Sequence, residues 1–193
     1  MSGSKIATNI IFPPLKDVMQ KVAAAVVNLY RLDYNLLDVD ANERSIAHKF
    51  AEHFQKEFPD WHVDCEYNRL GKDKKKLFEK FSPDFRRESS VPDDTEGSTV
   101  FPDIIVHKRK MPNNLLVMEI KKGNGADSQM DIQKLREFGR SKEYRYRYGM
   151  FLRLGEKGCS EVRFFEEWRE VEEQGRLLRE LIDKELEGQE YGG

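Results

Sequence analysis

The stretch 100–121 constrains the fold more strongly than any other part of the chain, because it has the pattern of a β-hairpin. Two apolar runs, 101–106 and 115–120, flank a segment at 111–114 that contains proline and asparagine. Proline fixes φ and asparagine tolerates the left-handed conformation, so this composition is typical of a turn between two strands. The sequence therefore predicts a sheet around which the rest of the domain is built.

Three charged residues interrupt the hairpin in a regular way. Asp103 lies at the start of the first apolar run, and Glu119 and Lys121 lie at the end of the second. Side chains alternate along a strand, so Glu119 and Lys121 share one face, and the hairpin brings Asp103 close to that end. Burying such charges costs several kcal/mol each unless they pair or bind a metal. This edge of the predicted sheet is therefore the candidate site.

The chemistry of these side chains favours a metal-dependent reaction. Carboxylate oxygens are the ligands that Mg²⁺ prefers, and Mn²⁺ is the alternative ion. A lysine beside them can orient an attacking water or stabilise negative charge in a transition state. Glu-x-Lys is weak evidence by itself in a chain that is 35% charged. Pro-Asp also recurs, but only Pro102-Asp103 begins an apolar strand that is followed by a second strand ending in the acid and the lysine.

Pro102-Asp103 and Glu119-Ile120-Lys121, on adjacent predicted strands, resemble the motif of the PD-(D/E)xK phosphodiesterase superfamily, the restriction-endonuclease-like nucleases. The resemblance covers these short motifs and the order of elements from residue 40 to residue 165. It implies an α/β fold with an αβββαβ core, a mixed sheet of four or five strands between helices, and extra N- and C-terminal helices. It also implies metal-dependent phosphodiesterase action, as an endonuclease or an exonuclease, that leaves a 5′-phosphate and a 3′-hydroxyl, with DNA favoured over RNA.

The resemblance assigns roles to the motif residues. Asp103, Glu119 and the Ile120 carbonyl would bind one or two Mg²⁺ ions, and Lys121 would position the attacking water. Many members of the superfamily complete the acidic site with a glutamate on the first core helix. Glu43 is the candidate for that role in this chain.

The helix that carries Glu43 is predicted over 43–58, with Asn42 as its N-cap. At helical spacing, Glu43 projects onto the same face as the apolar residues of this helix, at its N-terminal end. An alternative stays open, in which Glu43 only stabilises the first turn, an effect of about 0.3–1 kcal/mol. Glu57 also falls toward the apolar side and is the second candidate.

The chain is expected to form one nuclease-like domain over 1–193. Residues 1–40 would be an N-terminal helical extension, with one helix over 13–37. Residues 41–165 would be the catalytic core, with a polar insertion at 68–99, and 166–193 a C-terminal helix. Within the core, strands are predicted over 61–67 and 148–154 and a helix over 127–143, whereas 161–168 reads as a fifth strand or the lead into the last helix.

The net charge of −2 hides a basic middle and an acidic C-terminal segment. Basic residues with interleaved aromatic residues favour contact with a nucleic-acid backbone, although a solvated surface is the commoner explanation for an isolated charge run. The candidate contacts, which no motif anchors, are Lys74, Lys75, Lys76, Gln133, Lys134 and Arg140.

The remaining expectations concern compartment and partners. Two cysteines are too few for a disulfide framework, and no apolar run approaches the length that spans a bilayer, so a cytoplasmic protein without membrane contact is expected. A homodimer or protein partner could use the terminal helices. Two other functions stay open: a catalytically silent nuclease fold used for binding or assembly, and an interaction domain whose motif is coincidental. The last predicts Asp103 far from Glu119 and Glu43 facing water.

Overall fold

The computed structural model describes most of the chain outside residues 75–100. The described residues are 11–39, 41–66, 69–70, 73–74, 101–109, 111, 114–123, 127–141 and 144–188. The predicted contacts Lys75 and Lys76 lie outside them, and so does most of the polar insertion.

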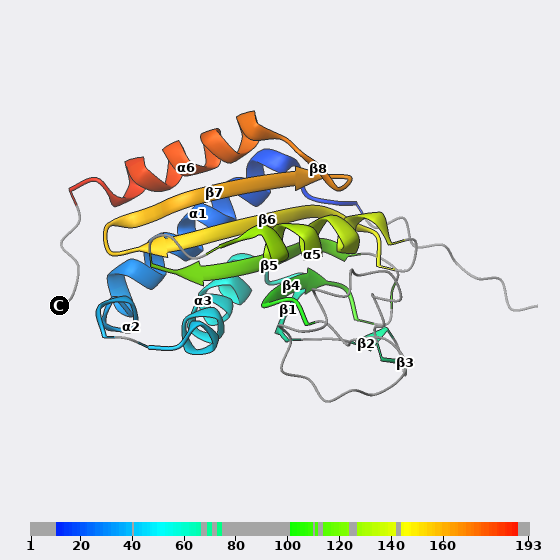
Figure 1. The fold of residues 1–193 in the computed structure, drawn as a ribbon, viewed down its shortest axis with the longest axis horizontal. Helices are drawn as coiled ribbons and strands as arrows, with labels where there is room; N and C mark the ends of the chain where they lie inside the picture. The colour runs from blue at the N-terminus through cyan, green and yellow to red at the C-terminus, as the bar shows by residue number, and fades with distance from the viewer. Residues whose placement is uncertain are drawn as a thin grey trace, which may run out of the picture.

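A six-stranded mixed sheet organises the described residues (Figure 1). Its order is β1-β4-β5-β6-β7-β8; β5 and β6 pair in parallel, and every other neighbouring pair is antiparallel. The strands are β1 (His62–Cys65), β4 (Ile104–His107), β5 (Asn114–Lys122), β6 (Tyr146–Gly155), β7 (Gly158–Glu166) and β8 (Arg169–Glu170). Two short strands, β2 (Arg69–Leu70) and β3 (Asp73–Lys74), pair with each other in a separate sheet.

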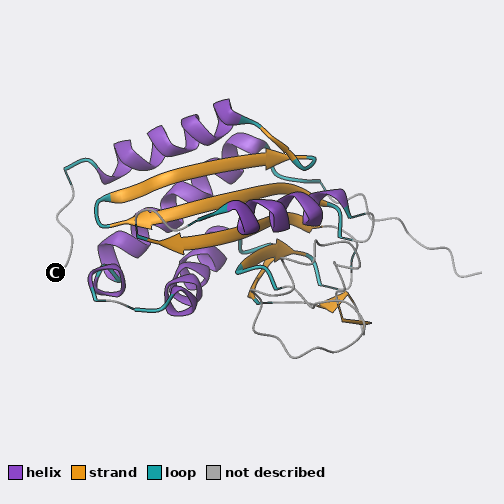
Figure 2. Ribbon diagram, viewed as in Figure 1, coloured by secondary structure: helices purple, strands orange, loops and turns teal. Residues whose placement is uncertain are grey.

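Helices cover both faces of the sheet, as Figure 2 shows. They are α1 (Leu15–Leu32), α2 (Asn35–Asp38), α3 (Glu43–Glu57), α5 (Gln129–Arg140) and α6 (Glu172–Leu186). The larger hydrophobic cluster joins α1, α3 and α6 to one face of the sheet, and the smaller cluster joins α5 to the other. The prediction of an α/β fold with a mixed sheet flanked by helices is confirmed. The sheet has six strands rather than four or five, because β8 adds a two-residue edge strand.

The alternation of side chains in β5 explains how one strand serves both layers. Met118 and Ile120 belong to the larger cluster under α3, whereas Val117 belongs to the smaller cluster under α5. Glu119 and Lys121 have the parity of Val117 and therefore lie on the α5 face. The predicted hairpin is confirmed as β4 and β5, with Ile104 opposite Met118, while Pro112 and Asn113 of the predicted turn lie outside the described residues.

The crossover from β5 to β6 brings α5 over the sheet. Parallel neighbours need such a connection, and a helix is the usual one. Ile132, Leu135 and Phe138 bury the inner side of α5 against the sheet. Helix α3 is fixed in the same manner by Ile46, Phe50 and Phe54, with Asn42 accepting a hydrogen bond from Ser45 N–H as the predicted N-cap.

The prediction of one continuous helix over 13–37 was wrong. Helix α1 ends at Leu32, and Asp33 leaves helical geometry with φ −132°. The Asp33 carboxylate instead lies 2.7 Å from Nε2 of His53 on α3, so a tertiary contact replaces the next helical turn. Helix α1 is also a principal part of the larger core, and α6 packs on β7 beside it. None of the helices in the described residues is both long and apolar enough to cross a bilayer.

Candidate active site

The open edge of β5 is where the site forms. Strand β4 begins at Ile104, opposite Met118, so β5 continues past the end of its neighbour. The backbone N–H of Ile120 would be left without a strand partner there, and Asp103 Oδ2 accepts its hydrogen bond at 2.7 Å. The N–H of Lys122, two residues on, donates to Glu43 Oε1 at 3.2 Å. Two carboxylates thus take the place of the missing strand.

Glu119 is the most deeply buried charge of the site, with 1% of its surface exposed. Its Oε2 lies 3.2 Å from Lys134 Nζ, but its Oε1 is buried without a hydrogen-bond partner. A buried carboxylate oxygen with no donor is costly, and such an atom in a structure calls for a ligand, a water or an ion.

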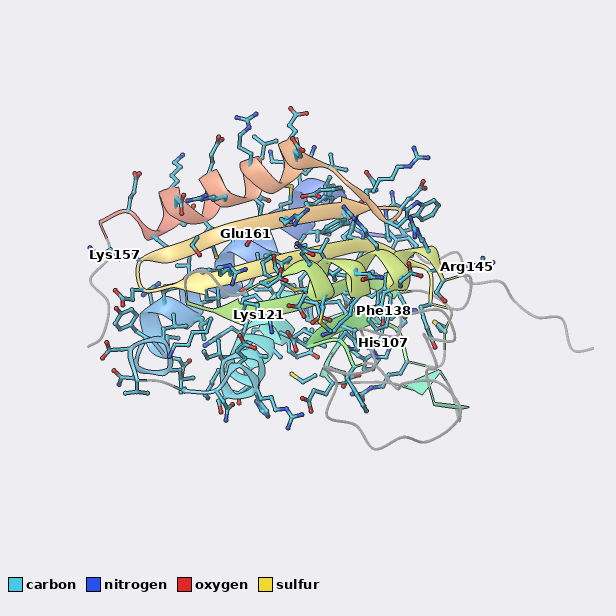
Figure 3. All side chains as sticks on the ribbon, in the orientation of Figure 1. His107, Lys121, Phe138, Arg145, Lys157 and Glu161 are labelled. Carbon is cyan, nitrogen blue, oxygen red and sulfur yellow. The ribbon has the colours of Figure 1, made fainter. Side chains whose placement is uncertain are left out.

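Lys121 and Glu43 come together from opposite layers. Lys121 Nζ lies 3.1 Å from Glu43 Oε2, and it also lies 3.5 Å from Asp131 Oδ2. Glu43 occupies the first turn of α3, and its side chain is 43% exposed. Figure 3 labels Lys121 near the middle of the molecule, on β5. The predicted approach of Glu43 to the motif residues is therefore present.

Asp131 and Lys134 on α5 complete the cluster. Asp131 is 4% exposed and lies 3.0 Å from Lys134 Nζ through Oδ1. Our sequence reasoning named Lys134 only as a nucleic-acid contact and did not name Asp131. The signal was present: Asp131 stands four residues before Leu135 and seven before Phe138, within the apolar stripe of the helix.

The surroundings of Asp103 and Glu119 oppose the ionisation of their carboxyl groups. Burial raises the pKa of Asp103 to about 6, partly offset by the Ile120 hydrogen bond. Burial, followed by the charge of Asp103, raises the pKa of Glu119 well above its ordinary value. Burial lowers the pKa of Lys134, but Glu119 and Asp131 outweigh it, so that pKa is raised. Each carboxyl would hold its negative charge more readily beside an additional cation.

The donor set suits a divalent cation by chemistry and charge. Asp103, Glu119, Asp131 and Glu43 supply four carboxylates, and Lys121 and Lys134 supply two ammonium groups, which leaves an excess of two negative charges when all are ionised. The unpartnered Glu119 Oε1 provides a free oxygen ligand. In the present side-chain arrangement, however, no three His, Cys, Asp or Glu groups among the described residues are gathered closely enough to hold an ion.

Ile120 contributes its backbone to this edge. Its side chain is buried in the larger core, and a strand directs the N–H and C=O of one residue to the same side. Its carbonyl is therefore aimed at the open edge that Asp103 occupies.

The other predicted residues belong to other surfaces or other elements of the described structure. Gln133 is exposed on α5, and Arg140 pairs with Glu137 at 3.1 Å on the surface. The backbone of Lys74 lies in β3. Glu57, the second candidate for the helix glutamate, is at the far end of α3, where its carbonyl accepts a hydrogen bond from Lys21.

The coincidental-motif alternative predicted that Asp103 would lie far from Glu119 and that Glu43 would face water. Asp103 instead bonds the residue next to Glu119, whereas Glu43 bonds Lys121 and Lys122 while 43% of its side chain stays exposed to water. Comparison with family models, with curated proteins and with solved structures found no match to this chain.

Proposed function

We propose that the protein is a metal-dependent phosphodiesterase that cleaves nucleic acid, with DNA favoured over RNA. The observation that carries the proposal is the buried, unpartnered Oε1 of Glu119 beside Asp103, in a cluster where four carboxyl groups meet two ammonium groups. The order of elements supports it: apart from β2 and β3, which form the separate sheet between β1 and β4, the elements α3, β1, β4, β5, α5 and β6 follow as helix, three antiparallel strands, helix and parallel strand. This is the αβββαβ order of the restriction-endonuclease-like nucleases.

In this proposal, Asp103, Glu119, the Ile120 carbonyl and Glu43 would hold Mg²⁺ or Mn²⁺. A bound ion would supply Lewis-acid chemistry, polarising the scissile phosphate and making a nearby water more acidic. Glu119 is fixed by burial in the sheet, and Asp103 is fixed by its bond to Ile120, so both oxygens are preorganised. Preorganised charges need little rearrangement at the moment of reaction, which is how such sites lower a barrier.

Lys121 is partly open to solvent, as a water-positioning group needs to be. Its side chain is 26% exposed and is shared between Glu43 and Asp131. An ammonium so placed can donate to the attacking water and offset negative charge that builds on the phosphate oxygens. In-line attack by water that breaks the bond between phosphorus and the 3′ oxygen would leave a 5′-phosphate, and protonation of the departing oxygen would give a 3′-hydroxyl.

The test is incubation of the purified protein with single- and double-stranded DNA and RNA, in Mg²⁺, Mn²⁺ or EDTA. Asp103→Asn keeps the hydrogen-bond acceptor for Ile120 but removes the charge, and Lys121→Met removes the ammonium. Asp60→Asn is the matched control, because Asp60 also follows a proline and is exposed. We expect metal-dependent cleavage by the wild type and the control only. Equal cleavage by all four proteins would overturn the site assignment.

A second function has its own supporting observation. Both lysines already pair with the carboxylates, so the cluster is partly neutralised by the chain itself. A catalytically silent protein that binds nucleic acid or a protein partner could retain such a cluster for stability. Absence of cleavage on every substrate, together with absence of Mn²⁺ binding by calorimetry, would favour this function.

A further inference from the structure

Lys134 is held in the site more firmly than a surface lysine. Its helix is anchored by Ile132, Leu135 and Phe138 in the smaller core. Its side chain is 20% exposed, and Nζ lies 3.2 Å from Glu119 Oε2 and 3.0 Å from Asp131 Oδ1. The ammonium therefore sits between two buried carboxylates that belong to different elements, β5 and α5.

Within the part of the chain that the structure describes, Lys134 is the one partner bonded to the Glu119 carboxylate. Lys121 pairs with Glu43 and Asp131 instead. A carboxylate as buried as Glu119 needs a compensating charge, because an unpaired buried charge destabilises a fold by several kcal/mol. Lys134 supplies that charge as long as no ion is present.

A divalent cation that binds Glu119 would come close to the same ammonium. Two positive groups on one buried carboxylate repel each other strongly, since the attraction and repulsion of charges are little screened there. The bond from Lys134 to Asp131 allows this repulsion to be relieved, because the ammonium can leave Glu119 and remain paired with Asp131.

We propose that Lys134 is a tethered counter-ion that stabilises the metal-free site and is displaced from Glu119 toward Asp131 when a divalent cation binds. Lys134 is thus a positioning residue that weakens metal affinity, and the Asp131 carboxylate pairs with the ammonium after it has left Glu119. The inference rests on the proposed function, because it takes Glu119 to be a metal ligand.

The experiment measures Mn²⁺ binding by titration calorimetry and by the electron paramagnetic resonance signal of free Mn²⁺. Lys134→Met removes the ammonium and keeps the length of the side chain, and Lys134→Arg retains the charge. Lys49→Met is the matched control, since Lys49 also pairs with an acid three residues along its helix, Glu52, at 2.8 Å, but on the surface. Glu119→Gln tests the ligand itself.

We expect Lys134→Met to bind Mn²⁺ about tenfold more tightly than the wild type, or better. Lys134→Arg and Lys49→Met should bind as the wild type does, and Glu119→Gln should lose binding. In EDTA, Lys134→Met should melt below the wild type, and saturating Mn²⁺ should raise its Tm by more than it raises that of the wild type.

Unchanged or weaker Mn²⁺ binding by Lys134→Met would overturn the inference, while loss of binding in Glu119→Gln would still support the metal site. If neither the wild type nor Lys134→Met binds Mn²⁺, the inference and the proposed metal site both fall. Binding by Lys134→Met alone would also overturn the inference, because Lys134 would then exclude the cation from the wild type and would not be displaced by it. Should Lys134→Met not fold, Asp131→Asn replaces it: Lys134 would then stay on Glu119, and Mn²⁺ should bind more weakly than to the wild type.

Discussion

Asp103 and Ile120 are joined by a hydrogen bond from the Ile120 N–H to Asp103 Oδ2, 2.7 Å long, at the point where β5 has outrun β4. The Asp103 side chain here supplies a hydrogen-bond acceptor that a neighbouring strand would otherwise provide. Asp103 therefore has a structural role that is separate from any contact with a metal. Some substitutions of Asp103 remove only its charge, and others also remove the acceptor oxygen.

Asp103→Ala should destabilise the metal-free protein by about 1–2 kcal/mol relative to Asp103→Asn, because only alanine leaves the Ile120 N–H without an acceptor. Both variants should lose metal-dependent cleavage. Urea unfolding in EDTA measures the difference. Equal stability of the two variants would show that water replaces the carboxylate at this edge.

The stability of the metal-free protein should depend on pH through Asp103. Its pKa is raised from 3.8 to about 6 by burial, so the folded state binds the proton more tightly than the unfolded state. Stability is then lost as the pH rises through this window, and Asp103→Asn removes the loss. The advantage of Asp103→Asn over the wild type should grow by up to about 3 kcal/mol between pH 4 and pH 7. Urea titrations in EDTA across this range test it, and a difference that does not change with pH would contradict the assignment.

Glu43→Gln distinguishes the two interpretations of this residue. The side chain is 43% exposed, so loss of its charge should change the free energy of unfolding by less than about 1 kcal/mol, and glutamine can still accept from Lys122 N–H. If Glu43 is a metal ligand, Mn²⁺ affinity should fall severalfold. If it only stabilises the start of α3, calorimetry should show unchanged affinity. Glu52→Gln, an exposed acid on the same helix, is the control.

Gly139→Ala should destabilise the protein by about 1–3 kcal/mol, although alanine normally favours a helix over glycine. A Cβ at this position would lie 3.0 Å from the backbone N of Trp168. That backbone is in the tight turn between β7 and β8, where Glu167 and Trp168 both have positive φ, so it has little freedom to move. Thermal unfolding measures the change against Gln133→Ala, an exposed position on the same helix that should be neutral or slightly stabilising.

Local patterns predicted the parts of the site that lie on one hairpin. The alternation of side chains in a strand put Glu119 and Lys121 on one face, and turn residues fixed which end of the hairpin Asp103 would approach. Helical spacing and the Asn42 cap placed Glu43 at the start of α3. Each of these inferences needs only neighbours along the chain.

Local patterns could not decide which lysine meets Glu119. Lys121 is two residues away from Glu119 on the same face, yet Lys134 makes the pair, because α5 lies over β5 at a distance set by Ile132, Leu135 and Phe138. The break of the first helix at Asp33 has the same origin, since its partner His53 is on another helix. Such pairings depend on distances between elements that are far apart in the sequence, and the periodicity of side chains within one element gives no information about those distances.

The division of the hydrophobic residues into two clusters has a consequence for when the site can exist. Glu43 is carried by the layer of α1, α3 and α6, Asp131 and Lys134 are carried by α5, and Glu119 stands on the strand between them. A nascent or partly unfolded chain that had assembled only one layer on this strand would lack either Glu43 or the pair formed by Asp131 and Lys134. Any chemistry that needs all of these charged groups can therefore occur only after both helical layers have packed on the sheet, so a partly folded chain is expected to be inactive.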